Sequence, residues 1–223
     1  MKKLHPKLDS IQEEKLSIFR DMVLEKNKVM NLTAITEEDK FYLKHFVDST
    51  KILSFVELKG RVLDLGTGAG FPGIPLAILC PDTEFFLIDS LRKRIRFLEE
   101  VVQRLELTNV SLLHARAEDA GRGELRESFD AVVTRALAPL PLLLEYCIPF
   151  LKTGANLYAY KGIKLDEELK ESKNALHQLK VKVEKVYIYT LGDEEHRILS
   201  AKKTKSTPKL YPRRPDEIKK APL

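Results

Sequence analysis

The chain has 223 residues, with 43% hydrophobic and 32% charged side chains and a formal net charge of +5. This length suits one domain with a short appendage, and no apolar run approaches the roughly 20 residues of a membrane span, so we expect a cytoplasmic protein with no membrane partner. The two cysteines, Cys80 and Cys147, form no C-x-x-C motif, which indicates neither a zinc site nor a disulfide framework and predicts no bound metal.

Two helices are predicted before residue 59. Residues 8–30 carry apolar side chains at a largely helical spacing. Residues 36–55 begin with a threonine that is followed by three acidic residues, a composition typical of a helix start. Together these helices form a predicted N-terminal helical extension, residues 1–58.

From Gly60 onward, short apolar strands alternate with helices. Such alternation predicts a mostly parallel sheet with right-handed crossovers, as in a Rossmann-like α/β fold. The predicted strands are residues 61–66, 84–89, 110–115, 129–136 and 155–162. The predicted helices are residues 72–80, 91–107, 140–151 and 165–179.

The last two predicted strands are connected differently. Only six residues join residues 181–189 to residues 196–204. A parallel crossover needs a dozen or more residues, so this pair is predicted to form an antiparallel hairpin at the end of a seven-stranded sheet. We therefore assign residues 59–201 to one α/β domain and expect the protein to be a monomer.

A glycine-rich loop follows the first strand of this domain, in VLDLGTGAGFPGIPLA, residues 62–77. Its GAGFPG segment, residues 68–73, fits the G-x-G-x-x-G fingerprint of a dinucleotide site, while Asp64 stands before glycines at alternate positions. Glycine is needed where the backbone turns sharply near a ligand, and the positive end of the next helix then points at that ligand. The fingerprint alone is a weak signal, so the residues around it must decide.

Two residues favour S-adenosylmethionine over a nicotinamide dinucleotide. The carboxylate of Asp64 would repel a pyrophosphate, whereas it would attract an ammonium and a sulfonium group. A dinucleotide-binding loop that begins at Gly66 would also require glycine at position 71, but the sequence has Phe71 there. We therefore predict S-adenosylmethionine as the cofactor, beside Asp64, Gly66 and Gly68. An NAD(P)-dependent oxidoreductase is the alternative.

The ends of the second and third strands predict an adenosine site. Asp89 ends the second strand, where an acid binds the ribose hydroxyls of either cofactor. After the third strand comes RAED, in which Ala117 and Glu118 would offer a backbone amide and an acceptor to an adenine. These residues suit both cofactors and do not separate the alternatives.

The basic charge of the chain is concentrated at its C-terminus. Residues 202–223 hold eight Lys or Arg and two acids, a net charge of +6, so the rest of the chain carries −1. Four prolines interrupt this tail, which predicts an extended segment. Such a charge asymmetry indicates an anionic partner such as RNA. The predicted phosphate contacts are Lys205, Lys209, Arg213 and Arg214, and Tyr211 would stack on a base.

Several motifs, spread over nearly the whole chain, resemble one bacterial family. They are NLTAI and KHFVDS before the domain, the glycine loop GTGAGFPGIPLA, LIDSLRKRIRFL, RAED, VVTRALAPL, and PKLYPRRP with KKAPL in the tail. On these motifs the sequence is similar to the ribosomal RNA small-subunit methyltransferase G family, also called glucose-inhibited division protein B.

The resemblance implies a class I S-adenosylmethionine-dependent methyltransferase fold. It implies methyl transfer to N7 of a guanine in the decoding-region loop of 16S ribosomal RNA, with that RNA or the small ribosomal subunit as partner. A non-catalytic RNA-binding protein that keeps a relic of this fold is a further alternative. The resemblance places cofactor contacts on Gly66, Phe71, Ala117, Glu118 and Arg135.

The implied chemistry requires no acid or base. Guanine N7 carries an in-plane lone pair and no proton, so the enzyme must exclude water and align the reactants. Arg135, at the end of the fourth strand, would position a phosphate, the guanine edge or the methionine carboxylate; an ion pair with a nearby acid is the alternative. His45 and Asp48, three residues apart, either cap the cofactor pocket or form a structural pair.

Overall fold

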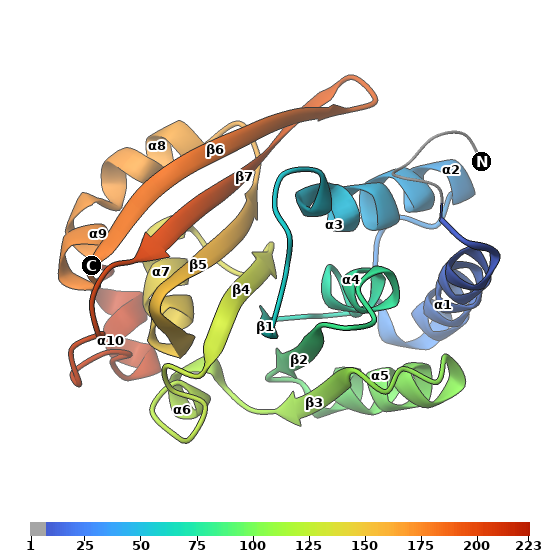
Figure 1. Cartoon of the computed structure of the whole chain (residues 1–223), viewed down its shortest axis with the longest axis horizontal. Helices are drawn as coiled ribbons and strands as arrows, with labels where there is room; N and C mark the ends of the chain where they lie inside the picture. The colour runs from blue at the N-terminus through green and yellow to red at the C-terminus, as the bar shows by residue number, and fades with distance from the viewer. Residues whose placement is uncertain (1–7) are drawn as a thin grey trace.

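The computed structural model describes residues 8–223, which form a seven-stranded sheet in the order β3-β2-β1-β4-β5-β7-β6 (Figure 1). Neighbouring strands among β1 to β5 are parallel, and β7 runs antiparallel to both of its neighbours. The predicted fold class is therefore confirmed. The strands are β1 (Arg61–Leu65), β2 (Glu84–Asp89), β3 (Val110–His114), β4 (Phe129–Arg135), β5 (Leu151–Lys161), β6 (Val181–Leu191) and β7 (Glu194–Lys203).

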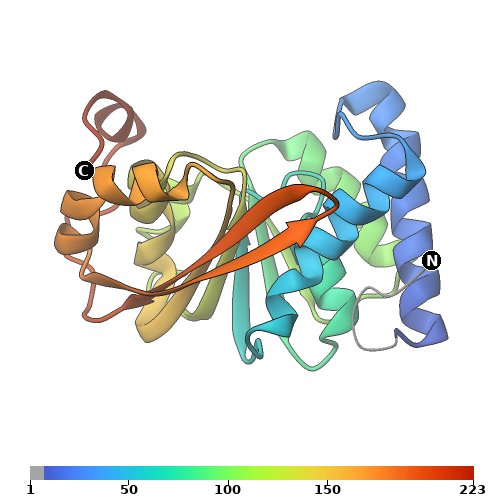
Figure 2. The same ribbon diagram turned by 90° about the horizontal axis from the view of Figure 1, so that it is seen from above.

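Helices cover both faces of the sheet, and each face has its own apolar core (Figures 1 and 2). On one face, α4 (Gly73–Leu79) and α5 (Arg92–Arg104) pack beside the N-terminal helices. No helix within residues 8–223 is long and apolar enough to cross a membrane. The other face carries α6 (Ala117–Ala120), α7 (Leu140–Cys147), the 3₁₀ turn η3 (Ile148–Phe150), α8 (Leu165–Glu171) and α9 (Lys173–Gln178).

The helix predicted over residues 165–179 is divided into α8 and α9. The break falls at Ser172, whose hydroxyl donates a hydrogen bond to the Glu168 carbonyl at 2.6 Å. A serine that bonds back to the carbonyl four residues earlier competes with the regular helix ladder and bends it. The sequence pattern found the helix but not this local competition.

The predicted N-terminal helices are both confirmed. The first is α1 (Ser10–Met30), which begins with a capping box between Asp9 and Gln12. The wholly buried Phe19 and Phe41 join the same core cluster as Phe85 of the sheet, so the extension packs on the domain. The second is one helical run made of α2 (Glu38–Phe41), the π-helical turn η1 (Tyr42–Val47), α3 (Asp48–Thr50) and the 3₁₀ turn η2 (Lys51–Ser54).

The β6–β7 hairpin, also confirmed, is longer than predicted. Its strands continue to Leu191 and Glu194, and the tight turn between them contains Gly192 with φ of +60°. The hairpin tip lies beside the second N-terminal helical run (Figure 2), where Lys44 and Glu194 form an ion pair at 2.7 Å. The hairpin therefore bridges the C-terminal edge of the sheet and the N-terminal extension.

The C-terminal tail is not the extended segment that its prolines predicted. Strand β7 continues to Lys203, beyond the predicted tail boundary at residue 202, and α10 (Pro215–Lys220) is a helix. Proline is compatible with a helix when it occupies the first position, because the missing N–H has no partner there. Pro215 occupies that position, and Ile218 in the same helix is wholly buried in the second core.

Candidate active site

The glycine loop turns through left-handed conformations directly after β1. Gly66, Gly68 and Gly70 have φ angles of +75°, +62° and +101°, which residues with a Cβ rarely adopt. A Cβ on Gly66 would also lie 2.6 Å from Cδ1 of Leu137. The Gly66 N–H donates to the carbonyl of Ile88 at 2.8 Å, so the turn is fixed against the end of β2.

Asp64 lies beneath this loop and not in the wall of a cleft. Its side chain is wholly buried, and Oδ2 accepts hydrogen bonds from the Thr67 hydroxyl at 2.7 Å and the Gly73 N–H at 2.8 Å. Burial raises the pKa of this carboxyl to about 6, against the opposing effect of the two hydrogen bonds. The expected cofactor contact at Asp64 is therefore corrected, because the carboxyl joins the loop to the start of α4.

A cleft of about 410 Å³ opens at the carboxyl edge of the parallel strands. This edge is where open α/β sheets bind their ligands, at the point where the strand order reverses. Four of the predicted cofactor residues lie in its wall, namely Gly66, Asp89, Ala117 and Glu118. The wall also contains Leu65, Ile88, Ser90, Leu91, Arg94, Ala115, Arg116, Ala136, Leu137, Tyr146 and Lys219.

Asp89 is held rigidly at one side of this cleft. Its Oδ2 accepts hydrogen bonds from the Gly68 N–H at 3.0 Å and from Arg94 at 3.2 Å. Its Oδ1 accepts from the Leu91 N–H at 2.9 Å. Because the residue is only 4% exposed and both oxygens are fixed, its carboxylate is preorganised between the glycine loop and α5.

Ala117 and Glu118 also line the cleft, at the start of α6. Glu118 is buried, with 5% exposure, yet its carboxylate forms no hydrogen bond or ion pair with any residue in the described part of the chain. A buried acceptor without a protein donor is costly unless a ligand or water supplies one. The geometry thus fits the predicted acceptor for an adenine amine.

Arg135 lies outside this cleft, in a hydrogen-bonded cluster between three elements. Its Nη1 donates to Asp48 Oδ2 at 2.8 Å and to the Lys44 carbonyl at 2.9 Å, and Nη2 lies 3.3 Å from His45 Nδ1. The guanidinium carbon is 5.4 Å from the ring centre of Phe71, on the glycine loop. Arg135 therefore forms the ion pair with a nearby acid that was one of its two predicted roles, and the acid is Asp48.

His45 completes this cluster as a neutral acceptor. Its ring stacks on Phe71 with 4.4 Å between the centroids, and Nε2 lies 2.8 Å from the Thr33 hydroxyl. Burial, reinforced by the charge of Arg135, lowers the pKa of His45 to about 4. Since an arginine can only donate, Nδ1 must accept, which places the proton of the neutral ring on Nε2.

The hairpin closes the cluster from the other side. The Tyr189 hydroxyl donates to Asp48 Oδ1 at 2.7 Å, and His196 Nδ1 lies 3.5 Å from the same atom. The sequence singled out His45, Asp48 and Arg135 separately but did not predict Tyr189 in the cluster. No local pattern could reveal it, because 141 residues separate Tyr189 from Asp48.

We predict that His45 titrates near pH 4 and makes folding depend on pH. The unfolded chain takes up this proton below its ordinary pKa of 6.5, whereas the folded protein does not until about 4. Stability from His45 is therefore complete above pH 6.5 and is lost as the pH falls toward 4. Between pH 7 and 5 the wild type should lose about 1–2 kcal/mol of unfolding free energy relative to His45→Gln, because the opposing contribution of Asp64, whose pKa is about 6, is common to both proteins; urea unfolding of the pair measures this difference. An NMR titration midpoint near 6.5 would contradict this assignment.

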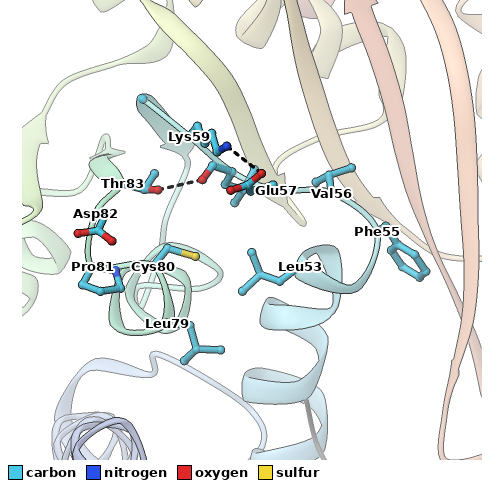
Figure 3. Close-up of a pocket in the computed structure, with 12 residues that line it drawn as sticks. Leu53, Phe55, Val56, Glu57, Lys59, Leu79, Cys80, Pro81, Asp82 and Thr83 are labelled. Carbon is cyan, nitrogen blue, oxygen red and sulfur yellow. Dashed lines mark hydrogen bonds and ion pairs between the residues drawn. The ribbon is translucent and has the colours of Figure 1, made fainter. Parts of the chain in front are cut away.

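A second cleft, of about 800 Å³, lies at the opposite edge, where β1 and β2 begin (Figure 3). Several of its polar groups have partners, since Lys59 pairs with Glu57 at 2.9 Å and the Thr83 hydroxyl donates to the Leu58 carbonyl at 2.9 Å. Burial raises the pKa of the Cys80 thiol to about 11, so it is not an activated nucleophile. Within residues 8–223, no three His, Cys, Asp or Glu side chains are placed to hold a metal.

Two of the predicted RNA-binding residues, Tyr211 and Arg213, instead make contacts within the folded protein. Tyr211 is only 7% exposed and packs in the second core, so the prediction that it stacks on a base is wrong. Arg213 forms an ion pair at 2.6 Å with the wholly buried Glu145, so its predicted phosphate contact is also corrected. In contrast, Lys205, Lys209 and Arg214 are exposed, as a phosphate contact requires.

Comparison with known proteins places this site in a family. The family described as GidB, rRNA small subunit methyltransferase G, matches residues 12–198. A ribosomal RNA small subunit methyltransferase G of Desulfitobacterium hafniense (strain Y51) is 50% identical over 99% of this chain and 93% of its own length. The chain belongs to this family. A methyltransferase G of Lactobacillus johnsonii is 45% identical over 97% of this chain and 93% of its own length.

Solved structures support the same fold. A SAM-dependent methyltransferase from Aquifex aeolicus has a TM-score of 0.56 and 21% identity, over 87% of this chain and 99% of its own. M. jannaschii TYW2, solved in complex with AdoMet, has a TM-score of 0.57 and 19% identity, over 70% of this chain and 74% of its own. This member of the methyltransferase G family is thus an S-adenosylmethionine-dependent methyltransferase, and the oxidoreductase and the relic RNA-binding protein are no longer favoured.

Proposed function

We propose that the chain transfers a methyl group from S-adenosylmethionine to N7 of a guanine in 16S ribosomal RNA. The names of its relatives support the RNA substrate. The observation that carries the choice of N7 concerns His45 and Asp48, the groups packed against Arg135. His45 Nδ1 and both oxygens of Asp48 already accept hydrogen bonds from Arg135 or Tyr189, which is consistent with a reaction that needs no general base.

The residues of the carboxyl-edge cleft fit the adenosine half of the cofactor. Asp89 would accept hydrogen bonds from the ribose hydroxyls, and the unpaired carboxylate of Glu118 would accept one from the adenine amine. Gly66 lines the cleft beside Leu137, and a Cβ there would lie 2.6 Å from Leu137 Cδ1, so only glycine fits at this position of the wall. When bound, S-adenosylmethionine supplies an electrophilic methyl group on a sulfonium, which leaves as a neutral thioether.

The Arg135 cluster lies next to the glycine loop, where the methionine end of the cofactor and the acceptor base would meet. Phe71 on the loop contacts both His45 and Arg135, so the loop and the cluster form one rigid surface. The guanidinium has five N–H donors, and only three of them form hydrogen bonds within the cluster. A remaining donor would orient the guanine edge, a phosphate or the methionine carboxylate.

This mechanism predicts a rate that hardly depends on pH. The acceptor N7 carries no proton at neutral pH, and His45 is already neutral above about pH 5 because its pKa is about 4. Single-turnover rates at saturating RNA and cofactor should therefore change by less than about twofold from pH 6.5 to 8.5. A rate that climbs tenfold per pH unit, and loses that slope when one residue is mutated, would reveal a general base and argue against N7.

We propose that the exposed basic residues of the tail track RNA phosphates. The combined Lys205→Ala, Lys209→Ala and Arg214→Ala variant should weaken RNA binding and reduce the slope of log affinity against log salt by about 2, since each phosphate contact on a single strand contributes about 0.7. Filter binding between 50 and 200 mM salt, roughly the range where such effects are large, measures both. An unchanged slope would show that these side chains only keep the protein soluble.

A further inference from the structure

The C-terminal helix α10 reaches the cofactor cleft. Lys219 on this helix lines the cleft together with Ser90, Glu118 and Tyr146, although it is the fifth residue from the C-terminus. It forms no hydrogen bond or ion pair with any residue among 8–223. Lys219 and its neighbour Lys220 are both exposed, but Lys220 does not line the cleft.

A buried ion pair holds α10 in this place. Glu145 on α7 is wholly buried, and Arg213 donates three hydrogen bonds to it, from its backbone N–H at 2.8 Å, Nε at 2.9 Å and Nη2 at 2.6 Å. Arg213 Nη2 also donates to the Ala221 carbonyl, beyond the end of α10, at 3.0 Å. Since Tyr146 follows Glu145 and lines the cleft, one turn of α7 supports both the cleft and the tail.

The chain that leads to α10 is also fixed. Arg126 donates to the carbonyls of Thr207 and Tyr211, both at 2.7 Å, and Arg122 donates to the Pro212 carbonyl at 2.9 Å. Each of these bonds joins a charged donor to a backbone acceptor, the stronger class of hydrogen bond. The tail is therefore part of the folded domain, and α10 has a defined position beside the cleft.

We propose that α10 is a permanent wall of the cofactor cleft and that Lys219 binds the adenosine half of S-adenosylmethionine. This inference rests on the proposed cofactor site. Adenosine presents ring nitrogens and ribose oxygens as acceptors, and an ammonium group offers three donors without an acceptor of its own. The buried carboxylate of Glu118, which has no protein partner, lies in the same cleft and favours a cation there, whereas Asp89 is already paired with Arg94.

The test compares neighbouring lysines by calorimetric titration with S-adenosylmethionine. Lys219→Met keeps the apolar stem and removes the donors, and it should raise the Kd by roughly tenfold, the effect of losing one hydrogen bond from a charged group. Lys220→Met removes the same charge one residue away and should leave the Kd within about twofold. Lys219→Arg, which keeps a donor, should restore most of the affinity. Melting temperatures of the variants establish that α10 stays folded.

Asp89→Ala, measured in parallel, separates this inference from the proposed site. If Asp89→Ala weakens binding and Lys219→Met does not, the cofactor site is right and the role of Lys219 is wrong. If Lys219→Met and Lys220→Met weaken binding equally, the effect is one of overall charge and the inference also fails. If neither Asp89→Ala nor Lys219→Met changes the Kd, the cofactor does not bind in this cleft.

Discussion

Replacing Arg135 by alanine should slow methyl transfer by about 100-fold or more at saturating cofactor and RNA, because a misplacement of about 1 Å in an aligned site can cost that much. The guanidinium joins β4 to the N-terminal helical run through Asp48, His45 and the Lys44 carbonyl. Its loss removes the donor that aligns the acceptor and releases the cluster behind Phe71. Cofactor affinity should change far less if Arg135 holds the guanine edge or a phosphate, since it does not line the adenosine cleft, whereas a contact with the methionine carboxylate would raise the Kd of the cofactor as well.

The design for Arg135 needs a charge-matched control. Arg104 is exposed at the end of α5, far from this cluster in the sequence. The Arg104→Ala variant loses the same charge as Arg135→Ala and should keep the full methylation rate. Arg135→Lys keeps a cation but cannot reach the three acceptors in a fork, so it should remain well below the wild-type rate. Single-turnover methylation measures the rate of each of the three variants. Their melting temperatures are measured as well, because loss of Arg135 leaves the buried Asp48 without its charged partner. A full rate in a folded Arg135→Ala variant would remove Arg135 from the site.

Asp89→Ala should give the largest loss of cofactor affinity. Hydrogen bonds to a charged group contribute about 1.5–3 kcal/mol, so the Kd should rise by about 10- to 150-fold. The side chain also receives the N–H groups of Gly68 and Leu91, so its loss loosens the glycine loop as well. Asp89→Asn keeps one of the two acceptor oxygens and should fall between wild type and Asp89→Ala. Calorimetric titration of the folded variants tests this, and an unchanged Kd for Asp89→Ala would exclude the ribose contact.

The sheet and the loop could be predicted because their signals are local. Residues 84–89 form β2 as expected, since a short apolar run with an acid at its end suits a buried strand that stops at a ligand. The glycine loop is likewise read from neighbouring residues. The hairpin was predicted from the length of its connection alone, although its strands continue further than the apolar pattern indicates.

The tail could not be predicted because its partners are distant in sequence. Its composition suggested an RNA-binding arm, but Glu145, 68 residues away, draws Arg213 inward, and Lys203 reaches Glu127 at 2.7 Å. Burying a carboxylate requires such a pair, and no pattern within the tail reveals the acid. The place of Asp64 was missed for a different reason. Its partners Thr67 and Gly73 are close in the sequence, but only the folded turn shows on which side of the loop the carboxyl lies.

The chemistry of the product tests the central claim most directly. Small ribosomal subunits, and separately 16S RNA freed of protein, from cells that lack this enzyme would be incubated with the protein and methyl-labelled S-adenosylmethionine, and the nucleosides analysed. We expect label in 7-methylguanosine alone, at a single guanine where borohydride and aniline cleave the RNA, and its loss in the Asp89→Ala variant at limiting cofactor. Label in any other nucleoside, or no label in either form of the RNA, would contradict it.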